Sequence, residues 1–322
     1  MINPIISIAI PIYNGEEFFT QTLDSIVAQI QDKPVELVLC DDKSNDKTLE
    51  IAKDYAQKYP FIRVFENDKN LGMDDNFLKV ASLSNGQYLW FSGQDDIFCD
   101  RAIDKILDVI EKKLPDFIYM NFSRNSHNMD KVIMQRMLEI DEDIYCPTYK
   151  EFLDVTGVDH LPSFLPSFIM KKELWDTAET EQFKGTQFIQ LGAFFSQLKN
   201  MKLYIVSDVL IKGRVPENRW QANSLKLLDI LSGDLEVIVY AYKHYGVVEK
   251  TMYKTHYKKV RKWILNTLID ARHDKHIISD KIKKRFKKIL TIKDFFITKI
   301  LINTPAVIYK SKLGMKVLRV LR

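Results

Sequence analysis

Two pairs of adjacent aspartates follow apolar stretches of the sequence and offer carboxylates for metal binding. Asp41 and Asp42 come directly after VELVLC, and Asp95 and Asp96 come after QYLWFSGQ. An ionised carboxylate is costly beside apolar groups unless a positive group meets it. Mg²⁺ and Mn²⁺ prefer oxygen ligands and commonly use one or two carboxylates together with substrate phosphates. The pairs therefore indicate a divalent cation that carries a phosphorylated ligand. The alternative is that they are surface turn residues, where aspartate is common.

The elements that would position these carboxylates alternate along the first hundred residues. Apolar runs predict strands, and apolar residues at helical spacing predict helices; the strands are 5–13, 35–40, 62–67 and 87–92, and the helices are 16–30, 47–59 and 73–84. This order predicts an α/β fold with a parallel sheet and right-handed crossovers. Ligands of such sheets bind outside the carboxyl ends of the strands. Both aspartate pairs fall at such ends, which favours a shared site.

Later elements are predicted with less regular spacing. Further helices are expected at 101–114 and 186–200, and further strands at 116–123 and 202–208. A strand that leads into a short helix is expected within 167–177. The stretch from 124 to 170 holds three of the ten prolines and is predicted to be largely irregular.

Two common kinds of phosphate-binding loop are missing from the sequence. Neither GxGxxG nor GxxxxGK[ST] occurs, and the chain has only 11 glycines. Dinucleotide-binding and P-loop proteins are therefore disfavoured. Metal-mediated phosphate binding is the natural substitute.

Cysteine usage and the N-terminus bear on the cellular compartment. The three cysteines have no CxxC spacing, which fits a reducing cytoplasm better than a disulfide scaffold. MINPIISIAIPIYN has no basic region before its apolar run, so we expect a first strand and not a signal peptide. The sequence has no run of about 18 apolar residues, so no membrane-spanning helix is predicted.

Three segments carry a resemblance to a known family. They are ISIAIPIYNGEEFFTQTLDSIVAQ, ELVLCDDKSNDKTLEIA and NLGMDDNFLKVASLSNGQYLWFSGQDDIF. In this order they resemble the nucleotide-sugar domain of family 2 glycosyltransferases, most closely the abequosyltransferase-like branch. The resemblance covers residues 5–122 well and thins out to about 210. It implies the A-type glycosyltransferase fold, with a mostly parallel nucleotide-binding sheet flanked by helices.

The resemblance also implies roles for residues at the strand ends. Pro11 and Tyr13 match the first loop of the family, where the aromatic ring packs beside the nucleotide base. Asp41 and Asp42 match paired carboxylates that face the base and ribose, and Asp42 is expected to accept hydrogen bonds from the base. Asn76 matches a segment that lines the pyrophosphate.

The metal ligands are implied in the same way. Gly93, Gln94 and Asp95 match the DxD motif, with glycine in place of the first aspartate. Asp95 is expected to bind Mn²⁺ or Mg²⁺, alone or together with Asp96. This chain has Asp75 where many relatives have arginine, so one phosphate-binding cation is missing.

The general base that takes a proton from the acceptor hydroxyl has no direct match. The stretch that corresponds to an acidic pair in many relatives, FKGTQFIQLGAFF (183–195), has no carboxylate. Asp159 and His160 in a polar, proline-bounded loop are the expected candidates, ahead of Asp176. GRVPENRWQ (213–221) has two interpretations: a mobile loop that closes on the diphosphate, or an ordinary connector.

The net charge of +4 hides a basic C-terminal region. Residues 249–322 have 21 lysines and arginines against 5 aspartates and glutamates, and the remaining residues have 26 against 38. The amphipathic patterns at 257–271 and 280–302 predict helices that lie on an anionic membrane. The alternative is a helical bundle with a solvated basic face. No aromatic RNA-recognition motif accompanies the charge, so nucleic acid is not an expected partner.

The predicted organisation is a catalytic domain at 1–221 and a basic helical region at 222–322. The catalytic domain would have a nucleotide-sugar half at about 1–123 and an acceptor half at about 124–221. The predicted function is inverting, metal-dependent transfer of a sugar, with UDP as the favoured nucleotide, to a hydroxyl of a glycan acceptor. The acceptor would be lipid-linked, in bacterial surface polysaccharide synthesis.

The enzyme is expected in the cytoplasm, peripherally bound to the inner face of the cell membrane, and no oligomeric state is favoured. One alternative is a catalytically impaired homologue that only binds a nucleotide sugar or a membrane. A nucleotidyltransferase is disfavoured because PIYNGEE is acidic where such enzymes need a glycine-rich basic loop.

Overall fold

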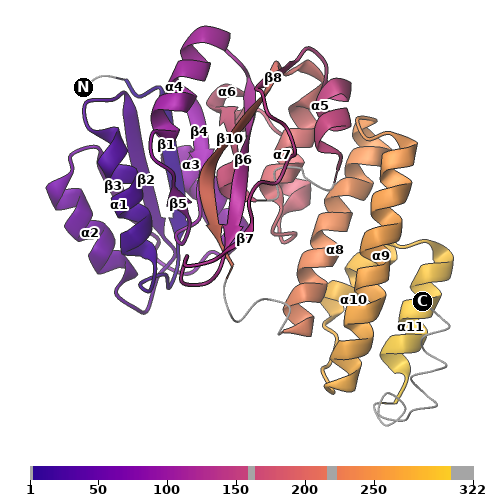
Figure 1. The fold of residues 1–322 in the computed structure, drawn as a ribbon. Coiled ribbons are helices and arrows are strands. Elements are labelled where there is room, and N and C mark those ends of the chain that lie inside the picture. The colour runs from indigo at the N-terminus through magenta and orange to yellow at the C-terminus, as the bar shows by residue number, and fades with distance from the viewer. Residues whose placement is uncertain (1–2, 159–163, 216–222, 306–322) are drawn as a thin grey trace. The chain divides into compact units, whose positions relative to one another are not determined.

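A computed structural model of the chain forms a ten-stranded sheet and eleven α-helices in the residues that it describes (Figure 1). The described residues are 3–158, 164–215 and 223–305. The candidate base residues Asp159 and His160 lie outside these ranges.

The chain divides into two compact units. The first comprises Met1–Gln182 and Ala193–Glu217, and the second comprises Phe183–Gly192 and Asn218–Arg322. The short internal segment of the second unit is a feature that the sequence pattern did not indicate. The assignment of a catalytic role to one unit and a membrane role to the other stays a prediction.

The first unit is built on a mixed sheet with a parallel half. The strands are β1 (Ile6–Ile12), β2 (Val35–Asp41), β3 (Ile62–Glu66), β4 (Tyr88–Phe91), β5 (Ile97–Phe98), β6 (Phe117–Asn125), β7 (Val132–Met134), β8 (Ile144–Cys146), β9 (Phe168–Lys171) and β10 (Leu203–Arg214). Their order is β3-β2-β1-β4-β9-β6-β10-β5, with β7 on β6 and β8 on β10. The strands β3, β2, β1 and β4 are parallel, β9 is antiparallel to both β4 and β6, and β10 is parallel to β6. The carboxyl ends of β1, β2, β4, β6 and β10 therefore lie at one edge.

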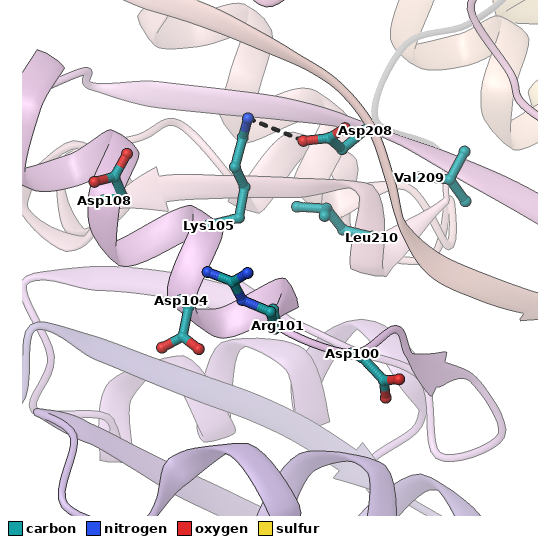
Figure 2. Close-up of a pocket in the computed structure, with 8 residues that line it drawn as sticks. All are labelled: Asp100, Arg101, Asp104, Lys105, Asp108, Asp208, Val209 and Leu210. Atoms are coloured by element: carbon teal, nitrogen blue, oxygen red, sulfur yellow. Dashed lines mark ion pairs between the residues drawn. The ribbon is translucent and has the colours of Figure 1, made fainter.

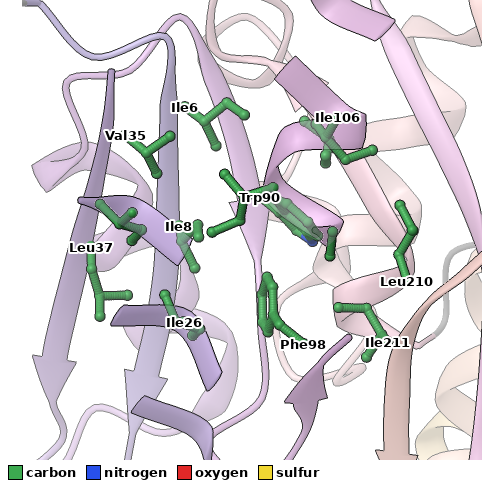
Figure 3. Packing of buried hydrophobic residues seen from close by; sticks show 14 of the residues in the cluster. Ile6, Ile8, Ile26, Val35, Leu37, Trp90, Phe98, Ile106, Leu210 and Ile211 are labelled. Atoms are coloured by element: carbon green, nitrogen blue, oxygen red, sulfur yellow. The ribbon is translucent and has the colours of Figure 1, made fainter. Parts of the chain in front are cut away.

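Helices cover both faces of this sheet, as parallel strands require. They are α1 (Phe19–Ile30), α2 (Thr48–Lys58), α3 (Met73–Leu83), α4 (Ala102–Lys113), α5 (Tyr149–Thr156), α6 (Lys172–Asp176) and α7 (Ile189–Gln197), the last of which begins in the second unit. Figure 3 shows Ile26 of α1 and Ile106 of α4 in one cluster with Ile8, Leu37 and Trp90 of the strands.

The opposite face of the sheet carries α3. Phe91 follows Trp90 in β4 and points to the other side because strand side chains alternate. Its ring centroid lies 5.2 Å from that of Phe77 in α3. Sandwiched between helical layers, the parallel strands hold their carboxyl ends in fixed register.

The stretch 124–170, predicted to be largely irregular, is more regular than expected. This stretch contains β7, β8, α5 and a turn of 3₁₀-helix that leads into β9. The helix α5 begins at a threonine cap, where Thr148 Oγ1 accepts the N–H of Glu151 at 3.3 Å. The short strands gain their stability from pairing with long strands, which no local pattern reveals.

The second unit contains a set of packed helices. They are α8 (Ser224–Tyr240), α9 (Lys250–His273), α10 (Asp280–Ile289) and α11 (Ile292–Asn303), with a π-helical turn after α8. The pattern at 280–302 is two helices, because α10 ends at Ile289 and Thr291 caps α11: its Oγ1 accepts the Asp294 N–H at 3.2 Å. Among the described residues no helix has the length and apolar character needed to cross a bilayer.

The apolar face of α9 is covered by neighbouring helices. Val260, Ile264 and Leu268 of the amphipathic pattern at 257–271 are buried in one cluster with Leu228 of α8 and Phe286 of α10, whereas Trp263 of the same pattern is 49% exposed. A bundle therefore accounts for this face, in line with the alternative interpretation of the basic region.

Candidate active site

The loop after β4 is fastened to the loop after β1 by the side chain of Gln94. Its Oε1 accepts the Tyr13 N–H at 2.8 Å, and its Nε2 donates to the Tyr13 carbonyl oxygen at 2.9 Å. Gly15 leaves room for the amide, since a Cβ there would lie 2.4 Å from Gln94 Cδ. Gln94 thus fixes the loop that precedes Asp95, while the Tyr13 side chain remains exposed at the rim.

The loops after β1 and β2 are also cross-linked. The Asn14 N–H donates to Ser44 Oγ at 3.0 Å, and the Asn45 N–H donates to Asn14 Oδ1 at 2.8 Å. Asp41 is fully buried and accepts both the N–H and the hydroxyl of Ser44, at 3.0 and 2.6 Å. Its carboxylate therefore shapes the turn after β2. Pro11, near the end of β1, is half-buried and pairs in register with Cys40.

The carboxylate of Asp42 holds the segment that precedes α3. Oδ1 accepts the side-chain N–H of Asn67 at 3.0 Å and the Leu71 N–H at 2.7 Å, and Oδ2 accepts the Gly72 N–H at 2.9 Å. Gly72 has a φ of 84°, a region that favours glycine. A carboxylate has about four acceptor positions. The three bonds leave one position on Oδ2 for a ligand.

Asn76 lies in the interior and not at the surface of the rim. Its Nδ2 donates to the Cys40 carbonyl at 3.0 Å, and its Oδ1 accepts from Asn67 Nδ2 at 3.0 Å. The same amide of Asn67 also bonds Asp42. Asn76 therefore anchors α3 to β2 and orients Asp42 through Asn67.

Asp95 and Asp96 converge on Gly93. A Cβ at residue 93 would lie 2.6 Å from Asp96 Oδ2 and 3.0 Å from Asp95 Oδ1. An aspartate at this position, as in the usual DxD motif, would displace the Asp96 carboxylate and crowd that of Asp95. Glycine is thus matched to a local arrangement in which two carboxylate oxygens approach the same point.

The electrostatics of this pair are unfavourable without a cation. Burial raises the pKa of Asp95, against the opposing effect of Arg214. Burial and the charge of Asp95 raise the pKa of Asp96 well above its ordinary value. Asp96 is 4% exposed and its Oδ1 accepts the Arg214 backbone N–H at 3.1 Å. A bound divalent ion would compensate both charges.

Arg214, at the end of β10, is buried and firmly held. Its Nε donates to the Asp95 carbonyl oxygen at 2.9 Å, and its guanidinium also donates to the His127 carbonyl oxygen. The guanidinium carbon lies 3.8 Å from the centroid of the Phe18 ring. The interpretation of a mobile loop therefore does not hold for its first arginine, which supports the backbone of the carboxylate pair. Arg219 and Trp220 lie outside the described residues.

The model of the family described as Glycosyl transferase family 2 matches residues 7–177, more than half of the chain. The chain belongs to glycosyl transferase family 2. It is a glycosyltransferase.

A curated relative agrees with this membership, and two solved structures share the fold. Abequosyltransferase RfbV of Salmonella typhimurium is 26% identical over 287 residues, covering 83% of this chain and 84% of that protein. The predicted resemblance to the abequosyltransferase-like branch is thereby confirmed.

The structure of S. aureus TarS 1–349 in complex with UDP-GlcNAc has a TM-score of 0.57 and 16% identity, covering 92% of this chain and 86% of that one. Mannosyltransferase PcManGT from Pyrobaculum calidifontis, in complex with GDP-Man and Mn²⁺, has a TM-score of 0.56 and 13% identity, covering 99% and 84%. The predicted A-type glycosyltransferase fold is confirmed.

The metal-binding oxygens of this glycosyltransferase fit a metal ion that takes its remaining ligands from a substrate. Within the described ranges, no group of three or more histidine, cysteine, aspartate or glutamate side chains could hold a metal ion. Two convergent carboxylate oxygens, from Asp95 and Asp96, are the arrangement expected for Mg²⁺ or Mn²⁺ that takes its remaining ligands from water and phosphates.

A separate hollow of the glycosyltransferase lies between α4 and β10 (Figure 2). It is lined by Asp100, Arg101, Asp104, Lys105, Asp108, Asp208, Val209 and Leu210. Lys105 pairs with Asp208 at 2.9 Å and with Asp143 at 3.0 Å. Irregular register of β10 against β6 between Val206 and Ile211 brings Asp208 to this surface. None of the predicted site residues lines the hollow.

The weaker base candidate Asp176 lies in α6. Its carboxylate pairs with Lys172 at 2.6 Å across one helical turn and is half exposed. This is an ordinary surface ion pair. The base therefore remains a prediction on Asp159 and His160.

Proposed function

We propose that this glycosyltransferase uses Mn²⁺ or Mg²⁺ to transfer a sugar from a nucleoside diphosphate to a hydroxyl of a glycan acceptor, with inversion. UDP is the favoured nucleotide. The observation that carries the proposal is the pair of carboxylate oxygens of Asp95 and Asp96 that converge over Gly93. The ligands named for the two solved relatives, UDP-GlcNAc and GDP-Man with Mn²⁺, support the class of donor.

The chain's own residues would divide the work of donor binding. Asp95, together with Asp96, would hold the metal, which supplies Lewis-acid stabilisation of the departing diphosphate. Asp42 would accept a hydrogen bond from the base at its remaining Oδ2 position, and the exposed ring of Tyr13 would pack beside the base. Gln94 and Arg214 would keep these groups in place by holding the backbone around them.

The acceptor hydroxyl must lose a proton as it attacks the anomeric carbon. We assign this step to the segment that contains Asp159 and His160, because the stretch 183–195 has no carboxylate. Replacing each by alanine or asparagine should lower turnover at saturating donor without changing donor affinity. Unchanged turnover in both variants would exclude the segment.

The proposed acceptor is a lipid-linked glycan in bacterial surface polysaccharide synthesis. Support comes from the basic second unit, which suits an anionic membrane surface. The proposed location is the cytoplasmic face of the cell membrane.

Donor screening by thermal shift, with and without Mn²⁺, tests the proposal. A ligand that binds only the folded state raises the melting temperature by mass action. We expect one UDP-sugar to give the largest shift, and only with the metal present. A panel of nucleoside-diphosphate sugars without any metal-dependent shift would contradict it, and a shift without transfer to any acceptor would favour the impaired homologue.

A further inference from the structure

Helix α11 carries an exposed apolar stripe, which we define as Ile292, Phe296 and Ile300. These residues recur every fourth position on one side of the helix and are 80%, 57% and 54% exposed. Phe296 and Ile300 also line a shallow hollow together with Lys299 and Pro305. Large apolar side chains scattered singly on a surface are ordinary, but three in a row along one helix form a candidate contact surface.

The opposite side of α11 is fixed inside the second unit, so the stripe cannot turn inward. Ile297 and Leu301 are buried in the helical core. Asp294 accepts from Arg261 Nε at 2.6 Å and from the Tyr257 hydroxyl at 2.8 Å, both on α9. The orientation of α11 about its own axis is therefore set by α9.

Apolar residues occur on both sides of α11, which is unusual for a helix at a protein surface. A helix that is apolar all round is normally buried in a core or in a membrane. At 12 residues, α11 is too short to span a bilayer, which needs about 20 residues. It has the length and character of a helix that lies in the plane of a membrane interface.

The charge around the stripe indicates the kind of partner that it contacts. Lys293 and Lys299 on α11 are exposed on either side of the stripe. The described part of the second unit has 19 lysines and arginines against 8 aspartates and glutamates. A second copy of the chain would bring the same positive surplus to the contact, whereas anionic lipid headgroups complement it.

We propose that α11 docks on an anionic membrane, with the stripe of Ile292, Phe296 and Ile300 inserted among the lipid acyl chains and Lys293 and Lys299 at the headgroups. This deepens the proposed function, because it names the surface that would bring the enzyme to a lipid-linked acceptor. It moves the membrane contact away from the α9 face, which the bundle buries.

Co-sedimentation of the full chain with vesicles tests this surface. The double variant Phe296→Ser/Ile300→Ser should bind vesicles of phosphatidylcholine and phosphatidylglycerol at least about tenfold more weakly than the wild type, because the inserted apolar area is lost. Val132→Ser/Ile133→Ser is the matched control: these two residues of β7 are comparably exposed and apolar. The control should bind like the wild type.

A second variant guards against misfolding. Ile292→Asp places a carboxylate in the first turn of α11, where the helix dipole favours it, so the fold should be kept while insertion is opposed. Its vesicle binding should also fall, with an unchanged melting temperature. Wild-type binding should weaken at high salt and on pure phosphatidylcholine, because lysines contribute.

Three results would overturn the proposal. One is equal binding of the stripe variants and the wild type to anionic vesicles. Another is a wild-type dimer that the stripe variants abolish, without vesicle binding. The third is vesicle binding that appears only after deletion of 306–322, which would identify this segment as the cover of the stripe. Metal-dependent donor binding, measured on the same variants without vesicles, should not change, so the two proposals fail separately.

Discussion

A carboxylate buried in the first unit and one buried in the second, helical unit have opposite surroundings. Asp96 and Asp294 are 4% and 6% exposed. Burial raises the pKa of Asp294, but hydrogen bonds from Thr291, Arg261 and Tyr257 outweigh it and leave the pKa lowered. Burial raises the pKa of Asp96 as well, and there the neighbouring Asp95 adds to the increase.

The two sets of surroundings distinguish a carboxylate whose hydrogen bonds stabilise the fold from a carboxylate whose charge a bound ligand would compensate. In the helical unit, Asp229 and Glu236 also have a buried partner, Arg285, at 2.7 and 2.8 Å. At the strand ends, the Arg214 guanidinium donates to the carbonyl oxygens of Asp95 and His127 and to Gln21 Oε1. The charge of Arg214 opposes the raised pKa of both aspartates but does not cancel it. Carboxyl groups with a perturbed pKa are characteristic of functional sites.

The largest effect is expected on the helical side of this comparison. Arg285→Leu removes the buried partner that Asp229 and Glu236 share, and breaking a buried ion pair costs about 3–5 kcal/mol. Chemical denaturation should show this loss in the free energy of unfolding. Lys288→Ala is the control, since Lys288 contacts the same Glu236 at 3.0 Å from an exposed position and should matter little. An equal loss of unfolding free energy in both variants would contradict the expected difference between buried and exposed ion pairs.

A smaller, pH-dependent effect is expected at Asp96. Because its folded-state pKa is raised above the ordinary 3.8, the folded state keeps a proton that the unfolded state has lost. The free energy of unfolding of the metal-free protein therefore falls as pH rises through this window, by at most about 1.4 kcal/mol per pH unit.

The variant Asp96→Asn isolates this contribution. The asparagine side chain keeps an Oδ1 that can accept the Arg214 N–H, and it has no charge that titrates. The stability difference between Asp96→Asn and the wild type should grow with pH in the presence of a chelator and shrink when Mn²⁺ is added. A difference that stays constant from pH 4 to pH 8 would contradict the account.

The smallest effect on stability is expected at Gln94. Gln94→Ala loses the two bonds to Tyr13 and should lower the free energy of unfolding by about 1 kcal/mol. Gln29→Ala is a matched control, because its amide bonds Ser25 and Cys99 away from the rim. Only the Gln94 variant should also weaken nucleotide binding, by about tenfold, as for a residue that orients metal ligands. Similar nucleotide affinities in both variants would contradict a positioning role.

Much of the parallel half of the fold could be predicted because each element carries its own periodic signal. The apolar run at 5–13 became Ile6–Ile12, and the helical pattern at 73–84 became Met73–Leu83. The elements of 124–170 were missed because three-residue strands are held by distant partners. Two available signals were overlooked: Thr148 with Glu151 caps α5, and Thr291 with Asp294 marks the break before α11.

The site was predictable in its residue types but not in its contacts. Asp42 and Asp95 stand at strand ends, as their position after apolar runs indicates. Arg214 lies 118 residues beyond Asp96, so no local pattern connects them. Whether a polar side chain points to a ligand or, like Asn76, to the interior depends on tertiary packing.

Titration of UDP into the protein with and without Mn²⁺ tests the central claim, that Asp95 and Asp96 hold a cation that binds the donor. In the wild type, Mn²⁺ should tighten UDP binding at least about tenfold, and Asp95→Asn should abolish this gain, because a metal contributes several kcal/mol to diphosphate stabilisation. Asp100→Asn, an exposed carboxylate close by in sequence, should retain it. An Asp95→Asn variant that keeps the full Mn²⁺-dependent gain would contradict the account.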